Sequence, residues 1–182
     1  MSNYRRANIK GGTYFFTVVT YRRQTFLCDD NVRKALRNGI RDVQTTHPFT
    51  IDGWVLLPDH LHCIWTLPPD DATFGKRWAM IKRFVTKQCG PELGREDLMN
   101  ESKRKRKEST IWQRRFWEHQ IRDERDYEIH MDYLHFNPVR HGYVKNVRDW
   151  PHSTFHRYVR EGVYDENWGG EASISLEDGF GE

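Results

Sequence analysis

Continuous apolar runs alternate along the chain with segments whose apolar positions recur at helical spacing, and each change of pattern marks an element. Residues 13–21, TYFFTVVTY, are β-branched or aromatic throughout and predict a buried first strand. Over 30–46 the apolar positions return at helical spacing, and an aspartate at 29 or 30 can serve as the N-cap. The chain therefore begins with a strand followed by a helix.

The next segments predict a hairpin and a second helix. Residues 49–57 and 60–67 are two apolar runs joined by a tight turn at Pro58-Asp59. Residues 73–89 place apolar side chains on one side and basic side chains on the other, as an amphipathic helix does. We expect Gly90-Pro91 to end this helix.

The second half of the chain alternates charged and periodic segments. Residues 94–110 are mostly charged without periodicity, which predicts an exposed, mobile loop. A fourth strand is expected around 116–121, and a third helix over 124–137 that Pro138 stops. Beyond Gly142 the pattern predicts an irregular tail with a short helix near 153–160.

The order β-α-β-β-α-β-α is typical of an α+β, ferredoxin-like domain with an antiparallel sheet. We expect the domain to span 1–145, with 94–110 as a mobile insertion, and 146–182 to form a C-terminal tail. The first two helices would cover one face of the sheet. The other face would remain for a ligand or for the last helix.

Charge and aromatic content favour a polyanionic partner. The 182 residues include 29 Lys+Arg against 26 Asp+Glu, with 7 Trp, 8 Tyr and 10 Phe. Bases stack on aromatic rings and phosphates attract cations, although the same residues also suit an ordinary core and a solvated surface. The acidic residues gather at 161–182. The candidate DNA contacts are Arg5, Arg6, Lys10, Arg114, Arg115 and the basic block with Lys103, Arg104 and Lys105.

Several classes of protein are disfavoured. No apolar run approaches the ~20 residues of a membrane span, and no secretory signal opens the chain. The three cysteines, Cys28, Cys63 and Cys89, share no CxxC spacing. This favours a reducing cytoplasm without disulfides or a thiolate zinc site.

Two histidines and a helical tyrosine carry the candidate chemistry. His60 and His62 are two residues apart in a predicted strand, so they share a face and can converge on one divalent ion, although such a pair is often structural. Tyr133 and Asn137 are one helical turn apart and can serve one site, although a helical tyrosine usually only packs. Tyr127, the main rival of Tyr133, falls on the apolar stripe of the same helix, and Tyr143, beyond Pro138 and Gly142, is expected to lie too far from that helix.

Several motifs together resemble a known family. HLH at 60–62 fits the HUH motif (His, hydrophobic, His) of single-strand endonucleases. WQRRFWEHQIRDERDYEIHMDYLHFNPVRHGYV resembles the signature block of REP-associated tyrosine transposases, which act on bacterial REP hairpins. YRRANIKGGTYFFTV, WVLLPDHLHCIWTLP and DWPHSTFHRYV also match in order. The likeness covers nearly the whole chain, and the long 94–110 insertion departs from it.

The resemblance implies a mechanism. Tyr133 matches the catalytic tyrosine, His60 and His62 match the metal pair, and Asn137 sits where relatives place a third ligand. An amide oxygen suits Mg²⁺ or Mn²⁺. The tyrosine would attack single-stranded DNA beside a REP hairpin and form a 5′-phosphotyrosine, and the protein would work in the bacterial cytoplasm at the nucleoid. REP-associated members can use the tyrosine helix within one chain, which is compatible with a monomer.

Two other functions compete with this one. A regulatory module that binds DNA hairpins and has vestigial or no cleavage activity would keep the same basic surface. A zinc or iron enzyme acting on a small molecule would use the histidines without binding DNA. Intact His60, His62 and Tyr133 favour the nuclease over the regulatory module.

Overall fold

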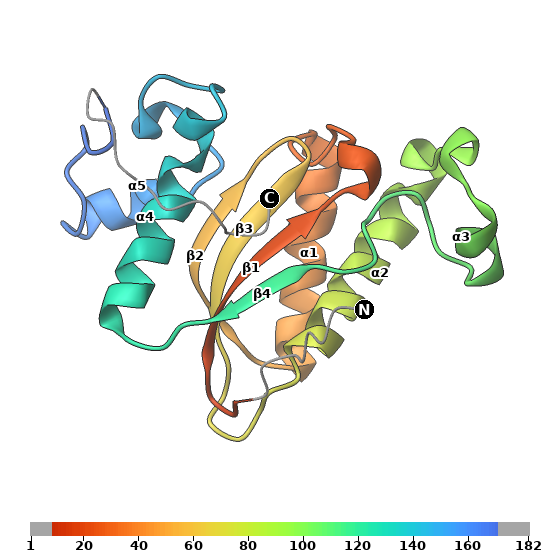
Figure 1. Ribbon diagram of the computed structural model, residues 1–182, viewed down its shortest axis with the longest axis horizontal. Coiled ribbons are helices and arrows are strands. Elements are labelled where there is room, and N and C mark those ends of the chain that lie inside the picture. Colours follow the sequence, from red (N-terminus) through yellow and green to blue (C-terminus); the bar gives the residue numbers. More distant parts are fainter. Residues whose placement is uncertain (1–8, 171–182) are drawn as a thin grey trace, which may run out of the picture.

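Four antiparallel strands form the centre of the computed structural model, which describes residues 9–170 (Figure 1). They are β1 (Thr13–Val19), β2 (Thr50–Leu56), β3 (His60–Thr66) and β4 (Trp117–Gln120), in the spatial order β2-β3-β1-β4. Because β1 and β2 both pair antiparallel with β3, they run parallel on either side of it. This is the split βαβ arrangement expected from the sequence.

One face of the sheet is covered by α1 (Asp30–Thr46) and α2 (Phe74–Leu93). The inward side chains of β1 on this face belong to an aromatic core, in which the rings of Trp65 and Trp78 stack at 4.2 Å. The two helices approach closely at Gly39, where an added Cβ would lie 3.1 Å from the Phe84 ring. Within residues 9–170, no helix combines the length and the apolarity needed to cross a membrane.

The opposite face is covered by α4 (Glu124–Arg140), and the chain after it, with η3 (Val147–Asp149) and α5 (Phe155–Arg160), lies beside α4 (Figure 1). A second core lies here, with Phe15 and Ile64 of the sheet against Met131 and Leu134 of α4. The segment after α4 binds to the edge strand β2. Ser153 forms a β-bridge with Val55, and Leu56 N donates to His152 O at 2.9 Å.

Two helices continue through prolines that were expected to end them. α2 includes Pro91 and α4 includes Pro138, so the predicted ends at Gly90-Pro91 and Pro138 were wrong by about one turn. A proline near the end of a helix removes only one of the last intrahelical hydrogen bonds. Beyond Pro138 the helix still closes, because His141 N donates to Asn137 O at 3.0 Å.

The charged segment 94–110 contains secondary structure, contrary to expectation. It forms η2 (Glu96–Leu98) and the short helix α3 (Glu101–Lys105), at the end of the molecule opposite α4 (Figure 1). The Asn100 side chain caps α3 by accepting from Lys103 N at 2.9 Å. The helix is one turn long, too short to show an apolar period, and only the capping residue signals it in the sequence.

Candidate active site

His60 and His62 lie on the face of β3 that is turned toward α4. Both are fully buried, and their ring centroids are 4.9 Å apart, so the structure brings the two imidazoles together as the sequence predicted. The register of the sheet places Thr17 of β1 opposite His62. Thr17 Oγ1 therefore lies 2.9 Å from His62 Nδ1 and fixes that side of the ring.

His60 is fixed by the carboxylate of the preceding residue. Asp59 Oδ1 lies 2.7 Å from His60 Nδ1, and Arg23 Nη1 donates to Asp59 Oδ2 at 3.2 Å. Burial would raise the pKa of Asp59, but the hydrogen bonds and positive charges of His60 and Arg23 outweigh it and hold this pKa below its ordinary value. Asp59 is thus ionised at neutral pH, as a partner of an imidazole N–H needs to be.

The turn that carries Asp59 is held by Thr20, and the backbone just after Thr20 is strained. Thr20 donates both its N–H and its hydroxyl to Asp59 O, each at 2.9 Å. In the following turn η1 (Tyr21–Arg23), Arg22 and Arg23 both have φ near 54°, in the left-handed region that non-glycine residues rarely adopt. Such strain is concentrated at functional sites. Here the strained residue Arg23 is the one whose guanidinium donates to the Asp59 carboxylate.

The hydrogen bonds at Nδ1 favour metal binding by the histidine pair. With Nδ1 of His60 held by Asp59 and Nδ1 of His62 held by Thr17, each ring presents Nε2 as its ligand nitrogen. A carboxylate or hydroxyl behind an imidazole is the usual outer support of a metal-binding histidine. The residues present therefore fit a divalent cation.

Tyr133 stands against this pair from the opposite side of the site. Its side chain is 1% exposed, and its ring centroid is 5.3 Å from that of His62. Two turns beyond Tyr133, at the residue that caps the C-terminus of α4, the His141 ring is 5.1 Å from the His60 ring. Asn137 is buried and lies one turn from each, on the same helix face. The helix thus presents Tyr133, Asn137 and His141 along the histidine pair.

Arg140 and His141 were missed by the sequence reasoning. Arg140 places its guanidinium carbon 5.3 Å from the centre of the Tyr133 ring, a cation–π geometry. Both residues follow Pro138, at which the helix was expected to end. Extending the i, i+4 spacing of Tyr133 and Asn137 by one more turn would have found His141.

The other two candidate tyrosines have different surroundings. The Tyr127 hydroxyl lies 3.4 Å from the Tyr158 hydroxyl, and burial together with Tyr158 raises the pKa of Tyr127 far above its ordinary value, which disfavours a nucleophile. Tyr143 is 42% exposed and lies closer than expected, with its ring 6.0 Å from the ring of His141. It stacks on Trp150, with ring centroids 5.5 Å apart.

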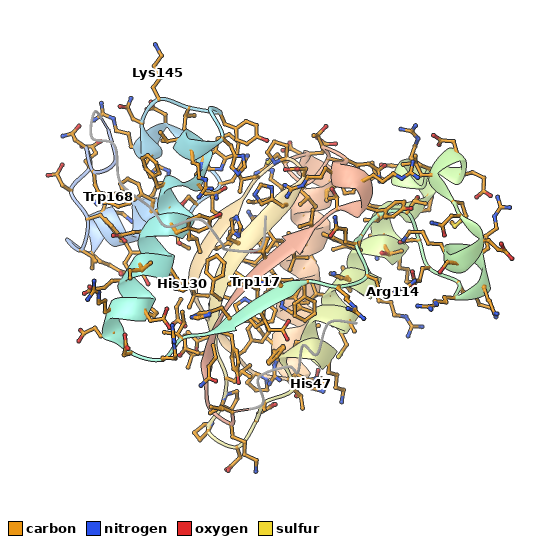
Figure 2. The ribbon with its side chains drawn as sticks, viewed as in Figure 1. His47, Arg114, Trp117, His130, Lys145 and Trp168 are labelled. Carbon is orange, nitrogen blue, oxygen red and sulfur yellow. The ribbon has the colours of Figure 1, made fainter. Side chains whose placement is uncertain are left out.

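Some of the basic candidates line a surface depression, and some already form ion pairs or hydrogen bonds within the protein. Arg114 and Arg115 line a depression of about 410 Å³ with Tyr21 and Arg22, at the end of the molecule that carries α3 (Figure 2). Arg114 is paired with Glu108 at 2.6 Å. Arg115 is exposed and has no ion pair within residues 9–170.

Lys103 differs from its neighbours in the basic block. It is 5% exposed, donates to Ser109 O at 2.8 Å and lies 4.0 Å from the centre of the Tyr21 ring, so the expected DNA contact is a structural lysine. Lys105 is exposed, as is Arg104, which pairs with Glu96. Lys10 is exposed beside Pro68 and Asp70. Arg5 and Arg6 lie outside the described residues.

Comparisons with known proteins identify close relatives. The chain is 47% identical over 173 residues to the REP-associated tyrosine transposase of Escherichia coli K12, covering 95% of this chain and 94% of that protein. A Haemophilus influenzae protein bearing the same family name is 42% identical over 97% of this chain and 98% of its own length. No protein-family model matches the chain.

A solved structure of similar shape is also known. It is a REP-associated tyrosine transposase bound to a REP hairpin, and it matches with a TM-score of 0.80 and 46% identity. The match covers 100% of this chain and 98% of the other. The structural match therefore includes β3 with its two histidines, α4 and the segment that follows α4.

Proposed function

The chain belongs to the family of REP-associated tyrosine transposases, and from that premise we propose that it cleaves and rejoins single-stranded DNA beside REP-type hairpins. The reaction would depend on a divalent metal ion, Mg²⁺ or Mn²⁺, and would pass through a 5′-phosphotyrosine. The observation that carries the proposal is the approach of Tyr133 to two histidines whose Nδ1 atoms are already held.

Each residue of the site has a part in this reaction. The Tyr133 oxygen attacks the scissile phosphorus, a Tyr–phosphate bond forms, and the bond to the 3′ oxygen of the preceding nucleotide breaks. The phenol gives up one proton and the departing 3′ oxygen takes one up, so the exchange is neutral in protons. Arg140, over the Tyr133 ring, favours the phenolate and the phosphate that approaches it.

His60, His62 and Asn137 would hold the metal ion. When bound, the ion would neutralise charge on the phosphate and make it a better electrophile. Asp59 and Thr17 keep the two imidazoles in the orientation that such binding requires. Because the linkage retains the energy of the phosphodiester bond, a second strand can be joined without ATP.

The hairpin partner is proposed from the relative that was solved with a REP hairpin and from the basic surface of this chain. Arg114 and Arg115, near the depression beside Tyr21, are proposed to contact the DNA backbone, together with Lys10, Arg104 and Lys105. Arg5 and Arg6 are proposed from the sequence alone. Such contacts position DNA without reading its sequence.

The decisive experiment is cleavage of an end-labelled REP-like hairpin with a single-stranded foot, in Mn²⁺ or Mg²⁺. The wild-type protein should nick the DNA and form a covalent adduct that survives denaturing electrophoresis. Tyr133→Phe should lose both by more than about 1,000-fold, because the nucleophile is absent. Tyr127→Phe, which removes the other hydroxyl of the same helix, should retain both and serves as the control.

Two other outcomes would change the proposal. An adduct still formed by Tyr133→Phe would assign the nucleophile to another tyrosine, and Tyr143 would be examined first because of its position beside His141. Hairpin binding by the wild-type protein without nicking in either ion would instead indicate a regulatory hairpin-binding module.

A further inference from the structure

A second cluster of metal-binding side chains lies where β4 leads into α4. It consists of His119 from β4 with Asp126 and His130 from α4. His119 Nε2 lies 2.9 Å from Asp126 Oδ2, and His130 Nδ1 lies 3.1 Å from Asp126 Oδ1. Figure 2 labels His130 on α4 and Trp117 on β4, the strand that also carries His119. Tyr133, one turn further along α4, belongs to the other site.

The donors of this cluster are close enough to share one ion. One donor atom from each residue lies within 4.8 Å of the other two. In a tetrahedral zinc site with bonds of about 2.0–2.1 Å, ligand atoms stand about 3.3–3.4 Å apart. The two His–Asp distances are already near this value. Rotation of the imidazoles would bring the remaining distance, between the two histidine nitrogens, to it as well. An ion would take the place of the N–H···O hydrogen bonds among the three groups, including the one from His130 Nδ1 to the backbone oxygen of Asp126 at 2.7 Å.

The surrounding contacts hold these side chains in place. The backbone N–H of Arg122 donates to Asp126 Oδ2 at 3.0 Å, which orients the carboxylate. The rings of His119 and His130 stack with centroids 4.4 Å apart and planes 10° from parallel. The Arg122 side chain reaches Asp126 at 3.3 Å but is 74% exposed, so it can move into water when an ion binds.

The cluster is separate from the histidine pair of the active site. Phe15 of β1 stands between them, with its ring 5.4 Å from that of His62 and 5.0 Å from that of His130. The donor sets also differ in kind. Two imidazoles with a carboxylate favour a borderline ion such as Zn²⁺, whereas an amide oxygen favours harder ions.

We propose that His119, Asp126 and His130 form a second metal site, for a zinc-like divalent ion, with water as the fourth ligand. The water would enter on the side of His119, whose side chain is 24% exposed, while the other two are nearly buried. The bound ion joins β4 to the first two turns of α4. It therefore stabilises the helix that carries Tyr133 without taking part in the chemistry.

The test counts zinc ions bound by untagged, chelator-treated protein in calorimetric titrations with zinc chloride. The double variant His60→Ala/His62→Ala removes the active-site pair and should still bind one equivalent. Adding His119→Gln should abolish that equivalent, because two donors cannot hold the ion tightly. Adding His47→Gln instead, a histidine on the far face of the sheet, should leave it unchanged.

Thermal unfolding supplies the second readout. Zinc should raise the melting temperature of the double variant and leave that of the triple variant with His119→Gln unchanged. Partial exposure of His119 makes this substitution compatible with folding, and melting without metal checks it. The proposal is overturned if the double variant binds no zinc, or if the triple variant with His119→Gln still binds one equivalent. Neither result bears on DNA cleavage, which the Tyr133→Phe experiment tests separately.

Discussion

Asp59 shows how one side chain determines the orientation of a reactive group. It lies between the His60 imidazole and the Arg23 guanidinium, at 2.7 and 3.2 Å, in a turn held by Thr20. Its lowered pKa keeps it charged at neutral pH, so it can accept from His60 Nδ1 throughout the range in which an enzyme works. At the scale of a residue, the proposed metal site depends on such supporting side chains as much as on the proposed ligands themselves.

Removing this support should weaken metal binding. Asp59→Ala frees the His60 ring to rotate, and we expect the Mn²⁺ concentration for half-maximal cleavage to rise about 10- to 100-fold. Asp59→Asn, which keeps a hydrogen-bond acceptor, should fall between Ala and wild type. The control is Asp71→Ala, which removes an ion pair with Arg77. Unchanged metal dependence in Asp59→Ala would refute the supporting role of Asp59.

At the scale of elements, α4 is the part that must be placed most accurately, because it carries Tyr133. It packs on β2 at Gly53, where an added Cβ would lie 2.8 Å from Met131 Sδ and 3.2 Å from Leu134 Cδ1. The absence of a side chain at Gly53 lets the helix approach the sheet. The approach of Tyr133 to His62 follows from this close packing.

Gly53→Val should therefore impair catalysis beyond its effect on stability. Overpacking of this kind costs about 1–3 kcal/mol of unfolding free energy. We expect the cleavage rate of the folded variant to fall as well, since α4 moves away from β3. Gly39→Val, which overpacks Phe84 on the opposite face, should cost similar stability and leave the rate unchanged. Denaturant unfolding and single-turnover cleavage measure the two effects, and equal rates in both variants would contradict the idea.

At the scale of the whole molecule, basic residues gather around the surface depression at the end that carries α3, which Arg22, Lys103, Arg114 and Arg115 line. Within this surface, exposure separates two kinds of cation. Arg115 is exposed beside a depression, whereas Lys103 is buried against the Tyr21 ring. A phosphate can reach the first without breaking a contact, and it would have to displace Ser109 and Tyr21 to reach the second.

Substitutions of these two cations should have opposite consequences. Arg115→Ala should weaken hairpin binding and reduce the slope of log affinity against log salt by about one, the value for one lost phosphate contact. Lys103→Met should lower the melting temperature and leave the affinity of the folded protein unchanged. Hairpin titrations over a series of salt concentrations, with melting curves of both variants, measure this. A normal salt slope in Arg115→Ala would remove that residue from the proposed interface.

The secondary-structure elements and the pair of histidines could be predicted from the amino-acid sequence, because both depend on residues close together in the chain. Runs of β-branched, aromatic and other apolar residues predicted β1 and the β2–β3 hairpin, helical spacing predicted α1, and i, i+2 spacing put His60 and His62 on one face. Motifs in the right order also indicated the family that the relatives then showed.

Contacts between residues far apart in the chain became known only from the folded molecule. Arg23 reaches Asp59, Thr17 reaches His62 and His119 reaches Asp126 because sheet register and helix docking bring separate elements together. The continuation of α4 past Pro138, which places Arg140 and His141 at the site, was decided likewise. Register and docking depend on packing summed over the whole chain. A local pattern, which reports only near neighbours, therefore locates the proposed reactive groups and leaves the residues that support them undetermined.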